Sequence, residues 1–215
     1  MKRIGGWVCV AAALLSWPWA VARAGETGKT LSVTGIGSVE ADVVADVGRF
    51  VEANYRADTT VKPPVEIGEV SAQTIVEALS GARSERDALL LGIVAVPETV
   101  FPDTLTLAGE GMAFLNITGL MPDPEKKDDP AEVEKSGWLI RKEAMRAFGL
   151  MIELTACPNP QCVLWPHKGR EQLEKKGANL CPPCLEHAHR ALRAKGVPVQ
   201  FGRNLDLPFS RQDEP

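Results

Sequence analysis

The sequence predicts an α+β fold, in which helices back a mixed, twisted β-sheet and a four-cysteine segment and a last helix follow. Two observations lead to this prediction. Short apolar segments typical of strands alternate with longer segments whose apolar residues recur at helical spacing. Four of the five cysteines lie in the last third of the chain. The order β-α-β-α-β-β-β-α favours one domain built around a mixed sheet.

The first elements of this order lie in residues 31–67. We expect a strand and turn over 31–39, and then a helix over 39–55 with Val43, Val44, Val47, Phe50 and Val51 on one face. Residues 62–67 are predicted as a short second strand or an extended edge of the sheet, because Pro63 and Pro64 cannot donate to a central ladder.

The later elements follow from similar signals. Ser71 is a candidate N-cap for a helix that ends near Gly81. The apolar run 88–96 predicts a strand buried on both sheet faces. We expect two further strands at 104–107 and 112–120, followed by a charged loop at 122–135. A helix is expected from Ser136, with apolar positions at Trp138, Leu139, Ala144, Met145, Phe148 and Ile152.

The N-terminal segment has the pattern of a secretory signal peptide. A cationic start, Met1-Lys2-Arg3, precedes the apolar run 7–21, and Ala22-Arg23-Ala24 places small residues where a signal peptidase requires them. We expect cleavage of residues 1–24 near Ala24-Gly25 and export of the mature protein to the periplasm or the medium. No later apolar stretch is long enough to span a membrane.

The charge of the chain argues against nucleic acid as a partner. The full sequence has a formal net charge of −4, and residues 1–24 contribute three basic and no acidic side chains, so the mature chain carries −7. An acidic chain without a basic stripe does not suit a polyanion. We expect a domain over 25–201 and a polar, loosely held tail over 202–215; nothing in the sequence indicates an oligomeric state.

The four downstream cysteines have the spacing of a tetrahedral zinc site. Cys157 and Cys162 are separated by four residues, Cys181 and Cys184 by two, and the two pairs by eighteen. Two disulfides are the alternative, because cysteines of exported proteins normally pair covalently and four cysteines allow three connectivities.

A third interpretation treats Cys181-Pro-Pro-Cys184 as a redox dithiol of the thioredoxin type, because a helix follows it and a helix N-terminus lowers a cysteine pKa. Its position near the C-terminus, without a preceding core strand, argues against this interpretation. It also leaves Cys157 and Cys162 unexplained.

Several residues in and after the helix at 136–152 resemble a known family. Lys142-Glu143-Ala144, Gly149, the cysteine spacing and Val163-Leu164 are similar to the archaemetzincins, zinc metallopeptidases whose sequences look like KEAxHELGHxLGLxHCxxxxCVM, with a CxxC about twenty residues on. The similarity extends over about 31–192. It implies an α/β-like metzincin architecture, and zinc rather than disulfides at the four cysteines.

The resemblance also fixes the positions of the family's catalytic motif, H-E-x-x-H-x-x-G-x-x-H. In that motif three histidines bind a catalytic zinc ion, the glutamate is the general base and the glycine turns the chain. In this chain the histidine positions carry Arg146, Leu150 and Ala156. Ala147 stands at the base, Glu153 at the turn glycine, and Leu164 at the methionine of the Met-turn.

We therefore expect no catalytic zinc. Arginine stays protonated, and leucine and alanine carry no donor. The chain's three histidines, His167, His187 and His189, follow the first cysteine pair, and we expect them to be solvated rather than ligands. His187 and His189 are also about 200° apart on a helix and do not share a face.

Two local consequences follow from the substitutions. With Glu153 at the glycine position, we expect the helix to continue past the point where the family's chain turns. Arg146 follows Glu143 by three residues, which favours an exposed ion pair; alternatively, the guanidinium faces the empty cleft and holds a carboxylate.

Three functional hypotheses remain. The first is a catalytically inactive, exported archaemetzincin-like protein with one structural zinc ion, which binds a peptide or an envelope protein. The second is an active zinc-dependent metallopeptidase with a non-standard site. The third is a thiol–disulfide oxidoreductase using Cys181 and Cys184.

Overall fold

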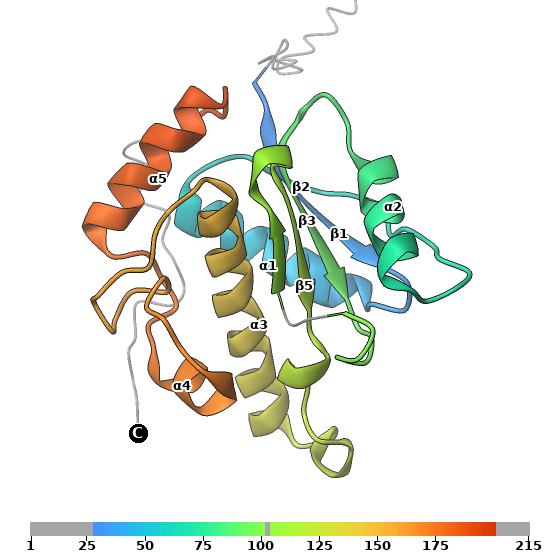
Figure 1. Cartoon of the computed structure of the whole chain (residues 1–215). Helices are drawn as coiled ribbons and strands as arrows, with labels where there is room; N and C mark the ends of the chain where they lie inside the picture. Colours follow the sequence, from blue (N-terminus) through green and yellow to red (C-terminus); the bar gives the residue numbers. More distant parts are fainter. Residues whose placement is uncertain (1–27, 102–103, 201–215) are drawn as a thin grey trace, which may run out of the picture.

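The computed structural model of the chain describes residues 28–101 and 104–200 (Figure 1). The predicted signal peptide, residues 1–24, and the predicted tail, 202–215, lie outside the described residues. Within the described ranges, no helix combines the length and the apolar character needed to cross a membrane.

A five-stranded sheet forms the centre of the fold. Strands β1, β2, β3 and β5 are parallel, and β4 pairs antiparallel with β5 at one edge, so the sheet order is β2-β1-β3-β5-β4. The predicted mixed sheet is therefore confirmed. The strands are β1 (Thr30–Ile36), β2 (Thr59–Val61), β3 (Asp87–Val94), β4 (Thr104–Leu107) and β5 (Met112–Asn116).

Helices cover both faces of this sheet. One core lies between the sheet and the helices α1, α3 and α5, and a second, smaller core lies under α2 (Figure 1). Every residue of β3 is buried, as its continuous apolar run predicts. The helices are α1 (Ala41–Tyr55), α2 (Ala72–Ala82), α3 (Pro130–Met151), α4 (Gly169–Lys175) and α5 (Pro182–Ala194).

Several predicted boundaries differ from the structure. The strand expected at 62–67 forms instead at Thr59–Val61, because the two prolines remove ladder donors; beyond them Val65 makes a single bridge to Ile36. The strand expected over 112–120 ends at Asn116, where the chain enters a short 3₁₀ turn. Ser71 does cap α2, since its hydroxyl accepts from the Thr74 amide.

The prediction of a loop up to residue 135 was wrong at its C-terminal end. Helix α3 already begins at Pro130, where a proline costs no hydrogen bond, and the Asp129 side chain caps it by accepting from the Ala131 amide at 3.0 Å. The seven-residue α4 was not predicted, because only Leu173 is buried in it and its apolar periodicity is correspondingly weak.

Polar contacts fix α3 against α1. The Tyr55 hydroxyl is fully buried and donates to the backbone oxygen of Met145 at 2.9 Å. The Arg141 guanidinium donates to both carboxylate oxygens of Asp46, at 2.6 and 2.9 Å. These contacts hold the middle and the end of α3 in place, and the four-cysteine segment starts directly after that end.

Candidate metal centre

The structure brings the four downstream cysteines together. All four Sγ atoms lie within 4.8 Å of one another, and those of Cys157 and Cys181 are 3.7 Å apart. A tetrahedral zinc ion with Zn–S bonds of about 2.3 Å places its sulfurs about 3.8 Å apart. The four side chains are free thiols. Across the described ranges, no other group of three or more His, Cys, Asp or Glu side chains converges in this way.

Backbone hydrogen bonds shape each half of this cluster. The Cys157 amide donates to the Leu164 oxygen at 3.1 Å, and the Cys162 amide donates to the Asn159 oxygen at 3.0 Å. Cys181 is the N-cap residue of α5, and its amide donates to the Cys162 sulfur at 3.4 Å. The N-terminus of α5 thus faces the sulfurs, and its dipole favours thiolates there.

The two halves are held together by a close approach of the backbone. The Gly177 amide donates to the Pro160 oxygen at 3.3 Å, and the Val163 amide to the Asn179 oxygen at 2.8 Å. A Cβ atom on Gly177 would lie only 1.9 Å from the Gln161 oxygen. Glycine is therefore required at 177.

The donor set suits a soft divalent cation. Burial and hydrogen bonds from neighbouring thiols raise the pKa of Cys184, and burial also raises that of Cys162. Burial alone would raise the pKa of Cys181 too, but hydrogen bonds from Cys184 and the other thiols lower it. Several thiolates this close together need a cation, and thiolates select zinc among common metals. The residues present therefore fit a structural zinc ion.

The same geometry bears on the redox hypothesis. Cys181 has the lowered pKa and the helix N-terminus that a redox dithiol requires. However, its sulfur lies 3.7 Å from the Cys157 sulfur and its amide donates to the Cys162 sulfur, so Cys181 belongs to one cluster with Cys157 and Cys162. The structure thus assembles four thiols rather than an isolated dithiol.

The positions of the family's catalytic motif lie along and just after the end of α3. The Arg146 side chain is 30% exposed, Leu150 is half-buried, and Glu153 and Ala156 are exposed. Ala147, at the general-base position, is fully buried. Leu164, at the Met-turn position, is buried, and its side chain lies 2.8 Å from where a Cβ atom on Gly149 would be.

The expectation that the helix continues past Glu153 was wrong. Helix α3 ends at Met151, and Glu153 has a φ of 63°, in the left-handed region that favours glycine. The Glu153 amide donates to the Leu150 oxygen and the Leu154 amide to the Gly149 oxygen, each at 3.0 Å. This is a Schellman motif, which satisfies the last carbonyls of the helix and ends it despite the glutamate.

The ion pair between Glu143 and Arg146 forms, but it is not exposed. The Arg146 Nη1 atom is 3.3 Å from Oε2 of Glu143, whose side chain is only 7% exposed. On its other side, Oε1 lies 3.3 Å from the Lys176 Nζ atom and 3.4 Å from the His167 Nε2 atom. Glu143 is buried because the segment between the two cysteine pairs packs over it.

Two of the three histidines are not solvated as expected. His167 is half-buried, and its Nδ1 atom is 3.0 Å from Lys176 Nζ. Burial lowers its pKa, and the positive charges of Lys176 and Arg146 add to this effect, although the Glu143 carboxylate opposes it. Burial also lowers the pKa of His189, which lies on the buried face of α5. His187 is exposed. A helical sequence shows which side chains share a face, but not which segment covers that face.

Lys176 is the residue of this cluster that the sequence did not point to. Its side chain is fully buried, and burial lowers its pKa to about 8 although Glu143 opposes the shift. It sits in the run Glu174-Lys175-Lys176, whose composition suggests only a solvated surface. The one available signal was its position between two cysteine pairs that must meet.

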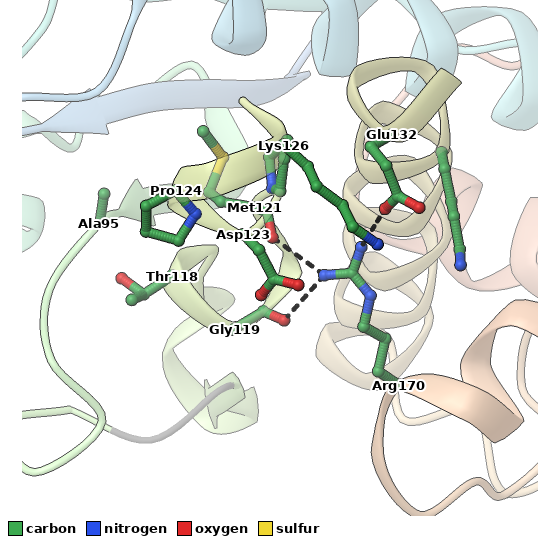
Figure 2. A pocket seen from close by; sticks show the side chains of 11 residues that line it. Ala95, Thr118, Gly119, Met121, Asp123, Pro124, Lys126, Glu132 and Arg170 are labelled. Atoms are coloured by element: carbon green, nitrogen blue, oxygen red, sulfur yellow. Dashed lines mark hydrogen bonds and ion pairs between the residues drawn. The ribbon is translucent and has the colours of Figure 1, made fainter. Parts of the chain in front are cut away.

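A separate pocket of about 580 Å³ opens at the carboxyl ends of β3 and β5 (Figure 2). Several of its charged side chains are engaged in hydrogen bonds or ion pairs with other residues of the protein. The Arg170 guanidinium donates to the oxygens of Met121 and Gly119, at 2.9 and 3.4 Å, and Lys135 pairs with Glu174 at 2.9 Å. These contacts attach α4 to the loop after β5 and to the start of α3.

Comparison with solved structures identifies similar folds. An archaemetzincin from Methanopyrus kandleri matches with a TM-score of 0.59 at 20% identity, covering 76% of this chain and 96% of that one. A zinc-dependent peptidase from Methanocorpusculum labreanum has a TM-score of 0.58 at 13% identity, covering 74% and 99%. The archaemetzincin from Archaeoglobus fulgidus, complexed with malonate, has a TM-score of 0.54 at 17% identity, covering 73% and 98%.

No protein-family model matches the chain, and no curated protein matches it by sequence. The structural similarity spans nearly the whole length of each of these three proteins. The chain therefore has an archaemetzincin-like fold, and its four-cysteine cluster fits a metal site.

Proposed function

We propose that this chain is a catalytically inactive, exported protein with an archaemetzincin-like fold. Four cysteines hold one structural zinc ion, and the surface along α3 binds a peptide or a segment of an envelope protein. One observation carries the proposal: a convergent four-sulfur site directly follows α3, and the three histidine positions of the family's motif, in α3 and just after it, carry Arg146, Leu150 and Ala156.

The absence of histidine ligands and of a general base along α3 supports the proposal that the protein is catalytically inactive. Zinc-dependent hydrolysis requires a metal held by protein ligands and a base that reaches the bound water. The sequence has no histidine in α3, and the base position is a fully buried alanine. Cys157, Cys162, Cys181 and Cys184 would supply all four ligands of the structural ion and leave no open coordination position for a substrate.

The edge of the sheet supports peptide binding. Among residues 28–101 and 104–200, strand β4 pairs only with β5, so its other side is a free edge of the described sheet. Helix α3 packs close to β4. An extended peptide can add to such an edge through backbone hydrogen bonds, and neighbouring side chains then select its sequence.

The first experiment measures metal and free thiols on the purified mature protein. We expect about one zinc ion per chain, and no thiol that reacts before the metal is removed and four that react afterwards. Two disulfides and no zinc would overturn the metal part of the proposal. Amino-terminal sequencing of the protein recovered from the periplasm or medium tests export, and the expected first residue is Gly25.

Activity assays separate the two enzyme hypotheses from the proposal. Peptide cleavage that a chelator abolishes in repeated preparations would support a metallopeptidase with a non-standard site. Insulin reduction that Cys181→Ser abolishes would support an oxidoreductase. We expect neither activity above background, because the catalytic ligands are absent and zinc-bound thiolates are not free to attack a disulfide.

A further inference from the structure

Positive charge exceeds negative charge around Arg146. Glu143 is the one carboxylate that pairs with Arg146 in residues 28–101 and 104–200, and the same carboxylate also contacts Lys176 and His167. Two cations thus share one anion in a largely buried cluster. Buried charges are stable only when paired, so this cluster can stabilise one further negative group.

Arg146 is the member of the cluster that a ligand can reach. Its side chain is 30% exposed, whereas the side chains of Lys176 and Glu143 are 0% and 7% exposed. Leu150, one turn further along the same face of α3, is half-buried, and Ala156 beyond the helix end is exposed. A ligand lying along this strip would meet a guanidinium that contacts Glu143 at 3.3 Å on one side.

We propose that Arg146 binds a carboxylate carried by a peptide ligand. This inference rests on the proposed peptide-binding function and names the chemical group that is recognised. A guanidinium is planar and offers five N–H donors, and its contact with Glu143 involves one terminal nitrogen. The remaining donors match a carboxylate in a two-point arrangement. The carboxylate comes either from the C-terminus of the peptide or from an aspartate or glutamate side chain.

The first test uses acetate as the probe and does not depend on peptide binding. Sodium acetate is titrated into the mature, zinc-loaded protein at constant ionic strength, with sodium chloride as the reference. The NMR signals of the Arg146 Nε–H group and the His167 ring are followed. We expect saturable shifts of both signals with acetate, none with chloride, and no saturable His167 shift in Arg146→Gln. Equal responses to both salts would overturn the inference.

The second test uses a synthetic peptide library as the probe. One set of acetylated octapeptides lacks Asp and Glu and is made with either a free or an amidated C-terminus; a second, amidated set contains Asp and Glu. We expect the wild type to retain one carboxylate-bearing set at least tenfold better than the amidated neutral set. The set retained identifies the source of the carboxylate.

Matched variants exclude a general charge effect or misfolding. Arg146→Gln should lose the tenfold preference. Arg146→Lys should keep part of it, because lysine keeps the positive charge but lacks the paired N–H donors of the guanidinium. Arg190→Gln removes an exposed α5 arginine paired with Glu186 and should retain the full preference. Zinc content and circular dichroism verify that each variant is folded.

The outcomes separate this inference from the proposed function. Equal retention of all peptide sets, with no response to acetate, would overturn the carboxylate site and leave peptide binding intact. A saturable response to acetate without retention of any peptide would overturn the proposed peptide binding and keep Arg146 as an anion site.

Discussion

The segment after α3 and the end of α3 itself differ in whether they carry side chains that can bind a metal. In the cysteine segment, residues 157–184, both the donors and the geometry of a metal site are present, with four sulfurs within 4.8 Å of one another. At the end of α3, the positions of the family's catalytic motif carry no metal donor apart from the exposed Glu153 carboxylate, yet the chain still turns after Met151 with Glu153 in a left-handed conformation.

The turn at the end of α3 therefore forms without a histidine ligand at any of these positions. Buried contacts hold the chain there instead: the Tyr55 hydroxyl donates to the Met145 oxygen, and Gly149 allows the Leu164 side chain to approach. In the cysteine segment, by contrast, we expect the backbone arrangement to depend on the metal ligands, because the proposed metal joins the two halves of the segment.

Metal removal should have the largest effect, because it should destabilise the cysteine segment much more than the sheet and α3. Structural zinc contributes about 10 kcal/mol or more to the folding of small domains. We therefore expect chelation, or Cys184→Ser, to lower the stability of the cysteine segment by more than about 5 kcal/mol. Hydrogen exchange by mass spectrometry should show lost protection in 157–194, with the sheet less affected. Zinc added back should restore protection in the wild type. Unchanged exchange after complete zinc removal would contradict the structural role.

The next largest effect is expected from the close backbone approach in the cysteine segment. Gly177→Ala places a Cβ atom against the Gln161 oxygen and should destabilise the protein by about 3 kcal/mol, with reduced zinc occupancy. The control is Gly137→Ala within α3, where an added Cβ atom has no contact within 4 Å and should stabilise the protein by about 0.5–1 kcal/mol. Urea unfolding compares the two; equal effects would argue against the tight contact.

The buried charge cluster predicts a specific pH dependence. Lys176 has a pKa of about 8 when folded and 10.5 as its ordinary value, so the unfolded chain binds more protons between these pH values. Below pH 8 the cost of burying the ammonium is present in full, and between pH 8 and 10.5 it is relieved as pH rises. The stability of the wild type relative to Lys176→Met should therefore rise across this window.

Unfolding by urea at several pH values measures this difference. The control is Lys175→Met, which removes an adjacent lysine whose side chain is 70% exposed. Its stability relative to the wild type should stay constant from pH 8 to 10.5. A constant difference for Lys176→Met would show that this lysine keeps its ordinary pKa in the folded protein.

The smallest effect concerns the turn after α3. A left-handed conformation costs a residue other than glycine about 1 kcal/mol, so Glu153→Gly should stabilise the protein by up to about that amount. Thr155→Gly, two residues further on and also exposed, lacks the positive φ and should destabilise slightly. Thermal unfolding of both variants measures the difference. Destabilisation by Glu153→Gly would indicate that the glutamate makes a contact that offsets its strain.

The sequence predicted the sheet and its main helices because their signals are local. The apolar run of β3 and the N-cap at Ser71 need no knowledge of distant residues. The start of α3 was missed because Pro130 stands in a charged segment, where a proline suggests a loop as readily as a first helical turn.

The spacing of the cysteines suggested that they meet, and the structure brings their sulfurs together. The surroundings of Arg146 could not be predicted in the same way. Lys175 and Lys176 are identical neighbours in the sequence, but one side chain is 70% exposed and the other is fully buried against Glu143. That difference depends on how the segment between the cysteine pairs folds back on α3. Glu153 shows the reverse case, in which packing imposes a conformation that its residue type disfavours.

The contact between Glu143 and Lys176 also affects how quickly the metal site can reassemble. Eighteen residues separate Cys162 from Cys181, and a free chain of that length has an end-to-end distance of roughly 25 Å. Lys176 is attached to α3 only five residues before Cys181, so the second cysteine pair stays tethered near the first. This tether raises the effective concentration of one thiol pair at the other. Wherever this contact re-forms in the metal-free protein, rebinding of the metal is a short-range closure rather than a search by a free loop.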